Sequence, residues 1–117
     1  MEATKREDPM VIRDEENNRV YTLDFTRDTV RFAEARGFEW DLIEHQPATM
    51  IPIIWYTAFR RYDERISFEK TEKLLERLGG FKPKYAKKLR KLYEQCLETL
   101  IATDEEDDEK NGLKVEL

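Results

Sequence analysis

One apolar stretch decides the fold of this 117-residue chain: Met50-Ile51-Pro52-Ile53-Ile54-Trp55-Tyr56-Thr57-Ala58-Phe59. Apolar residues occupy almost every position, a pattern typical of a helix buried on several sides. Thr49 is placed to cap this helix, and Pro52 then falls in the first turn, where its missing N–H breaks no intrahelical bond. The charged residues that follow, 60–65, return the chain to solvent. We therefore expect this stretch to be the central core element.

Helical patterns lie on both sides of the central stretch. Thr26 and Gly37 are suited to begin and end one helix, and Ser67 and Gly79-Gly80 to begin and end another. Pro83 suits the first position of the last and longest helix, which we expect to continue to about Thr103. That helix carries apolar residues at three- and four-residue spacing, namely Tyr85, Leu89, Leu92, Tyr93, Cys96, Leu97, Leu100 and Ile101.

Two β-favouring runs precede the helices. Residues 10–12 and 20–25 flank a polar segment, and the second run alternates Tyr21, Leu23 and Phe25 with polar residues. This pattern predicts a hairpin, and since two strands alone are marginal in water, the hairpin must pack on helices or pair with another chain. The predicted fold class is mainly α with a small N-terminal β-hairpin (α+β), a compact bundle of about four helices.

The length fits a single domain, predicted to span residues 10–103. Residues 1–9 are charged and predicted to form a flexible N-terminal arm. Residues 104–109 are six consecutive acids, and 104–117 is predicted to be a disordered acidic tail. No stretch reaches the ~18 apolar residues of a membrane span, and a single cysteine suits a reducing compartment. We expect a cytoplasmic protein with no membrane contact.

The charge balance argues against nucleic acid as a partner. Acidic residues outnumber basic ones by 26 to 21, which gives a net charge of -5, whereas binding to phosphate backbones needs a basic footprint. One basic concentration opens the last helix, and it leaves a small nucleic-acid-binding regulator as an alternative function. Its members are Lys82, Lys84, Lys87, Lys88, Arg90 and Lys91. Most of them fall opposite the apolar stripe, as in an ordinary solvated face.

Residues suited to catalysis or metal binding are sparse. The only histidine, His45, and the only cysteine, Cys96, cannot assemble a zinc site, and the acidic run lacks the spacing of a calcium loop. Cys96 occupies an apolar helix position, where a free cysteine usually behaves as a small buried hydrophobe. The sequence therefore predicts no enzyme, no metal site and no cofactor.

The apolar content points instead to protein binding. Three short helices and a hairpin are not expected to cover both the central stretch 50–59 and the stripe 85–101, and uncovered aromatic groups mark interfaces. The residues predicted from spacing to bind a partner protein, or a second copy in a homo-oligomer, are Trp55, Tyr56, Phe59, Tyr85, Leu89, Leu92 and Tyr93.

The layout over residues 10–103 resembles the tail assembly chaperones of siphophages and of prophages in Gram-positive bacteria. The resemblance is carried by the order of short motifs, none of them catalytic. They are Tyr21-Thr22-Leu23-Asp24-Phe25, Thr26-Arg27-Asp28-Thr29-Val30, Arg36-Gly37-Phe38, a Pro-Ile helix ending Ala58-Phe59-Arg60, Lys70-Thr71-Glu72-Lys73-Leu74-Leu75 with Gly79-Gly80, and a long last helix.

The resemblance implies a non-enzymatic chaperone of virion morphogenesis. Such a protein binds the helical tape measure protein, keeps it soluble and helps tail tube subunits to polymerise around it. It acts in the host cytoplasm and is absent from the finished virion. A structural tail component is the remaining alternative.

Overall fold

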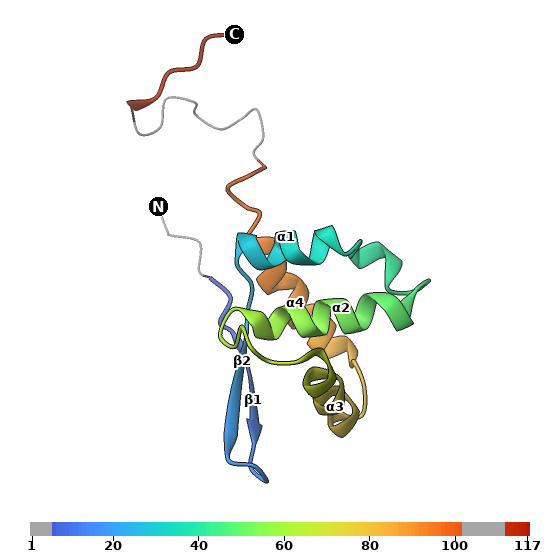
Figure 1. Ribbon diagram of the computed structural model, residues 1–117. Helices are drawn as coiled ribbons and strands as arrows, with labels where there is room; N and C mark the ends of the chain where they lie inside the picture. Colours follow the sequence, from blue (N-terminus) through green and yellow to red (C-terminus); the bar gives the residue numbers. More distant parts are fainter. Residues whose placement is uncertain (1–5, 102–111) are drawn as a thin grey trace.

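A β-hairpin precedes four α-helices and one short 3₁₀ helix in the computed structural model, which describes residues 6–101 and 112–117 (Figure 1). This arrangement confirms the predicted mainly helical α+β fold. The elements are β1 (Met10–Asp14), β2 (Arg19–Leu23), α1 (Arg27–Ala35), η1 (Trp40–Leu42), α2 (Pro47–Arg60), α3 (Phe68–Leu78) and α4 (Pro83–Gln95).

The hairpin is antiparallel and has one buried face. Its register pairs Met10 with Leu23 and Asp14 with Arg19, so alternate side chains share a face. Tyr21 and Leu23 are buried, whereas Val11 and Val20 on the opposite face are 47% and 54% exposed. The predicted alternation is therefore confirmed, and Figure 1 shows the hairpin extending beyond α2 with α3 beside it.

Local capping chemistry fixes the ends of α1 and α3. Thr26 and Thr29 exchange side-chain-to-backbone hydrogen bonds in a capping box at the start of α1. Ser67 Oγ accepts from the N–H of Lys70 at 3.0 Å at the start of α3. Gly37 and Gly79, with φ of 83° and 87°, follow the last turns in the left-handed conformation that favours glycine. All four predicted boundaries are confirmed.

Helix α2 is the central element, as predicted. Ile54, Trp55 and Ala58 are 0% exposed, and α2 packs against α1, α3, η1 and β2. The indole Nε1 of Trp55 donates to the carbonyl of Thr71 at 2.7 Å, so the largest buried side chain has its polar atom satisfied. The N–H of Asp24 donates to the carbonyl of Ala58 at 3.0 Å and joins the end of the hairpin to α2.

The predicted start of α2 is wrong by three residues. The helix begins at Pro47 after Gln46, and no side chain caps it, so Thr49 is already inside the first turn. Pro47 takes the first position, where a fixed φ favours helix. Pro52 consequently lies in the helix interior, where it cannot donate to the carbonyl of Ala48. Ala48 is exposed, and water can satisfy that carbonyl.

The predicted length of the last helix is also wrong, because α4 ends at Gln95. The N–H groups of Cys96 and Leu97 bond to carbonyls three residues back rather than four, which tightens the chain into turns. Leu100 and Ile101 are 58% and 76% exposed. Short helices depend on packing of an apolar face for most of their stability, and these two residues are not among those packed against the core.

The two ends of the folded body meet. The N–H of Glu7 donates to Oε1 of Gln95 at 3.0 Å, and Lys88 Nζ lies 2.5 Å from Glu7 Oε2. The structure therefore holds Glu7 against α4, whereas the sequence placed it in a flexible arm. Residues 1–5 and the acidic run 104–109 lie outside the described residues. Residues 112–117 are described and exposed.

Candidate protein-binding surface

Five of the seven residues predicted to bind a partner belong to the hydrophobic core. Their exposed fractions are 0–5%, so they do not form an open groove; they are Trp55, Phe59, Leu89, Leu92 and Tyr93. Trp55 and Phe59 lie on the central helix α2, and the other three are buried because α4 turns its apolar stripe inward, where the ring of Tyr93 packs edge-on against Phe25 and Trp40. Only Tyr56 and Tyr85 keep partial exposure.

A different surface gathers large side chains around Tyr56. The ring centroid of Tyr56 lies 5.9 Å from that of Phe32 on α1 and 5.5 Å from that of Phe68 on α3. Phe32 and Tyr56 are half-buried, and Phe68 is 43% exposed. Three helices thus each contribute one ring to a row that remains open to solvent.

Two arginines complete this row. The guanidinium of Arg36 lies 3.5 Å from the ring centroid of Phe32, and that of Arg60 lies 4.4 Å from it. Arg60 Nη1 also donates to the hydroxyl of Tyr56 at 2.9 Å. We call these five residues, Phe32, Arg36, Tyr56, Arg60 and Phe68, the aromatic–arginine surface. Cation–π stacking holds both long arginine side chains over the ring of Phe32.

The charges of Arg36 and Arg60 are not balanced within the described chain. Among residues 6–101 and 112–117, no carboxylate lies within ion-pair distance of either guanidinium. Arg36 donates to the carbonyl of Phe32 at 3.3 Å, a neutral acceptor. Arg61 and Arg77, by contrast, hold buried Asp24 and Asp14 at 2.6 and 2.7 Å. The aromatic–arginine surface therefore presents positive charge beside apolar rings.

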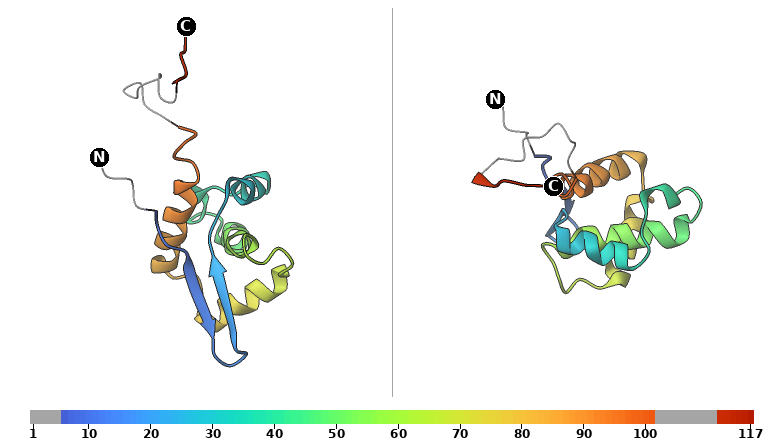
Figure 2. Two further views of the ribbon diagram at one scale, coloured as in Figure 1. Left: turned by 90° about the vertical axis from the view of Figure 1, so that its left-hand side faces the viewer. Right: turned by 90° about the horizontal axis from the view of Figure 1, so that it is seen from above.

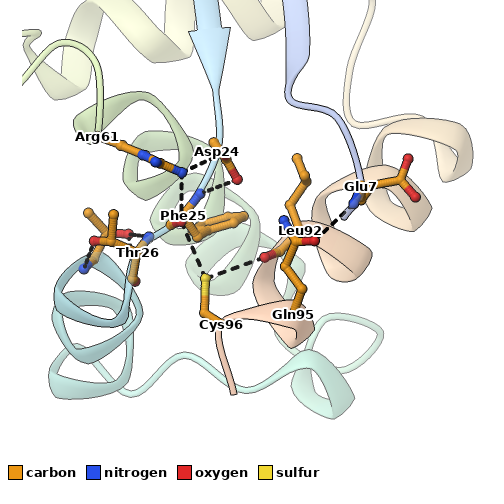
Figure 3. Close-up of polar contacts among 9 residues, drawn as sticks. Glu7, Asp24, Phe25, Thr26, Arg61, Leu92, Gln95 and Cys96 are labelled. Atoms are coloured by element: carbon orange, nitrogen blue, oxygen red, sulfur yellow. Dashed lines mark hydrogen bonds and ion pairs between the residues drawn. The ribbon is translucent and has the colours of Figure 1, made fainter. Parts of the chain in front are cut away.

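A second polar cluster lies where β2 leads into α1, and its contacts are structural (Figure 3). Arg61 Nη1 donates to Asp24 Oδ2 at 2.6 Å, and the N–H of Phe25 donates to Asp24 Oδ1 at 2.8 Å. The thiol of Cys96 donates to the carbonyl of Phe25 at 3.3 Å. Burial raises the pKa of the Cys96 thiol, so this group stays protonated and is a poor nucleophile.

Two other titratable side chains that bear on chemistry are His45 and Tyr93. His45 is exposed. Burial raises the pKa of Tyr93 to about 12, which keeps the phenol neutral. Within the ranges that the structure describes, no group of three His, Cys, Asp or Glu residues is arranged to hold a metal ion. None of the helices in those ranges has the length and apolar content that a membrane crossing requires.

The basic residues of α4 are partly neutralised by their own chain. Lys88 pairs with Glu7, and Arg90 Nε lies 3.4 Å from Glu94 Oε2. Lys82 and Lys84 each lie 5.7 Å from the ring centroid of Tyr85. The face that could serve the alternative nucleic-acid function is thus less basic than its sequence suggests.

Comparison with known families gives one match. A family described as a domain of unknown function, DUF5055, matches residues 3–117. The chain belongs to this family. No curated protein and no solved structure matches this DUF5055 chain.

Sequence reasoning found one residue of the aromatic–arginine surface, Tyr56, and missed the other four. A local signal was present. Arg36, the residue that caps the end of α1, follows Phe32 by four residues, and Arg60 follows Tyr56 by four residues on α2. That spacing places an aromatic ring and a cation on the same helix face. In this DUF5055 chain the two pairs meet through the packing of α1 on α2, which only the structure shows.

Proposed function

We propose that this DUF5055 chain is a non-enzymatic protein-binding helper that receives its partner on the aromatic–arginine surface. The observation that carries the proposal is the stacking of Arg36 and Arg60 on the ring of Phe32, with no carboxylate among the described residues paired to either arginine. Aromatic residues and arginine supply most of the binding energy in protein interfaces, and here they are already ordered.

The proposed partner is a tape measure protein, with tail tube subunits as the second client, on the resemblance to phage tail assembly chaperones. A tape measure protein is a long helical chain that exposes apolar side chains until it is enclosed. The three rings can cover such an apolar face, and the two guanidinium groups can pair with acidic residues beside it. The chain would act in the cytoplasm during assembly and leave before the virion is complete.

Co-expression with the tape measure protein encoded in the same genome tests the proposal. We expect the DUF5055 chain to raise the soluble fraction of that protein and to co-purify with it. The double variant Arg60→Ala, Phe68→Ala should weaken binding about 30- to 1,000-fold, since each such truncation typically costs about 1–2 kcal/mol and the two costs add. The matched control is Arg31→Ala, Tyr62→Ala, which removes an exposed arginine and an exposed ring from outside the surface.

Three outcomes would contradict the proposal. The first is no co-purification and no gain in solubility. The second is equal loss of binding in the test and control variants. The third is the chain's presence in purified virions, which would favour a structural tail component. Binding to DNA with a steep dependence on salt, lost in Lys87→Ala, Lys91→Ala, would favour the nucleic-acid alternative.

A further inference from the structure

The outer edge of β1 is unpaired. Within the described residues, no backbone hydrogen bond joins β1 to any segment except β2. In an antiparallel pair, alternate N–H groups of an edge strand point away from the partner and are free to bind another strand. In the left view of Figure 2, the lower part of β1 forms the outer side of the hairpin.

An apolar hollow lies beside that edge. It measures about 120 Å³ and is bounded by Ile12 of β1 and by Leu74 and Leu78 of α3, with Arg13, Asp14 and Arg77 around it. The hollow beside β2 has a different lining, in which Arg19, Thr22 and Asp63 are mixed with Val20 and the rings of Tyr21, Phe59 and Tyr62. A strand added at the β1 edge would bury its aliphatic side chains against Ile12, Leu74 and Leu78.

Residues 113–117 of the same chain have the pattern of such a strand. The sequence Leu113-Lys114-Val115-Glu116-Leu117 alternates apolar and charged residues without interruption. Leu113, Val115 and Leu117 are all exposed, and within the described residues the segment makes no hydrogen bond. It has the same length as β1, five residues, and lies within the region matched by the family.

We propose that residues 113–117 pair with the outer edge of β1 in the same molecule and form a third strand, parallel to β1. In the register that sets Leu113 beside Met10, Val115 falls beside Ile12 and Glu116 beside Arg13. The leucines and Val115 then face the same side as Ile12 and fill the hollow over Leu74 and Leu78.

Charge and reach both favour this arrangement. Arg13 is exposed and has no ion-pair partner among the described residues, so Glu116 meets an unbalanced cation. The contact of Glu7 with Gln95 places the end of α4 close to the start of β1. Since each residue of an extended chain spans up to ~3.3 Å, the connection from Gln95 to Leu113 is ample. A segment tethered in this way competes effectively against a second copy at low protein concentration.

Residue-resolved amide exchange by NMR tests the proposal on the full chain and on a chain ending at residue 111. We expect the β1 amides that do not bond to β2 to exchange at least tenfold more slowly in the full chain. Val115→Asp should abolish this protection, whereas Lys114→Asp, which places the same residue on the opposite face, should retain most of it. Equal exchange in the full and shortened chains would overturn the proposal.

Two further measurements fix the register and the molecularity. Glu116→Arg should reduce the protection, and the double variant Arg13→Glu, Glu116→Arg should restore it; failure to restore would overturn the parallel register. Protection that is unchanged on tenfold dilution supports pairing within one molecule. Protection that falls on dilution would assign the strand to a second copy and overturn the intramolecular proposal. None of these results depends on the proposed partner protein.

Discussion

Arg77 holds both carboxylate oxygens of Asp14. Its Nη1 and Nη2 donate to Oδ2 and Oδ1 at 2.7 and 2.9 Å, and they join the last turn of α3 to the last residue of β1. The Asp14 side chain is only 2% exposed and also accepts from Nδ2 of Asn17 at 2.8 Å. Hydrogen bonds from Arg77 and Asn17 to the charged form hold the pKa of Asp14 well below its usual range.

Asp14→Asn should lower the melting temperature by several degrees at pH 7, because Arg77 loses its buried charged acceptor. In the unfolded chain Asp14 is protonated near pH 3.9, whereas its pKa in the folded protein is lower. The contribution of ionised Asp14 to the free energy of unfolding is therefore complete above about pH 5 and is lost as the pH falls. The difference between the proteins should therefore shrink from pH 5 toward pH 2. Glu16→Gln is the control, since Glu16 also contacts Arg77 but is 82% exposed. Equal losses in both variants would contradict this assignment.

Leu89→Ala should cost about 2–5 kcal/mol in the free energy of unfolding, because Leu89 is fully buried and its loss leaves a cavity. Leu100→Ala removes the same atoms from an exposed side chain and should change the unfolding free energy by less than about 0.5 kcal/mol. Urea unfolding followed by circular dichroism measures both. A Leu89→Ala protein of unchanged stability would show that α4 exposes its stripe.

Pro52→Ala should raise the free energy of unfolding by about 1 kcal/mol. Alanine restores the hydrogen bond to the carbonyl of Ala48, and inside a helix its propensity is more favourable than that of proline by about 3 kcal/mol. Part of this gain is offset, because the unfolded chain gains conformational entropy and the folded protein loses the contacts of the proline ring. Pro47→Ala at the first helical position should bring no such gain. Urea titration of both variants decides between them, and a loss of stability in Pro52→Ala would place Pro52 outside the helix interior.

Tyr93→Phe should flatten the alkaline end of the stability profile. Burial raises the pKa of Tyr93 to about 12, so the unfolded chain releases this proton near pH 10 while the folded chain retains it. The wild-type protein should therefore lose about 2 kcal/mol between pH 10 and 12 that Tyr93→Phe does not lose. Tyr62→Phe, at a half-exposed ring, should follow the wild type. Identical slopes in the wild type and Tyr93→Phe would contradict the burial of this hydroxyl.

The sequence predicts element boundaries well where the deciding chemistry is local. Thr26, Ser67 and Gly79 cap helix ends by interactions with backbone groups only a few residues away, so these caps can be predicted from a few adjacent residues. At the start of α2 two local signals compete, Thr49 as a cap and Pro47 as a first residue. The helix begins at Pro47, and as a result Pro52 lies in the helix interior, where one backbone hydrogen bond is missing.

The proposed binding residues are harder to predict, because exposure is a property of the whole fold. A stripe such as that of Leu89 and Leu92 has the same spacing whether a neighbour covers it or a partner does. Here α4 is covered by its own chain, and the open surface comes from Phe32, Tyr56 and Phe68, which are distant in sequence. Only the packing of α1 and α3 on α2 brings those rings together.

The contact of Glu7 with Gln95 brings the first and last parts of the folded body together, before β1 and at the end of α4. Proteins whose ends lie close together often tolerate circular permutation, in which the old ends are joined and new ends are created elsewhere while the elements keep their neighbours. The exposed turn at Asn17 and Asn18 is a suitable place for the new chain ends. A rearranged gene could thus join α4 directly to β1 and begin with β2, keeping the contacts of the core while moving both chain ends to the far tip of the hairpin.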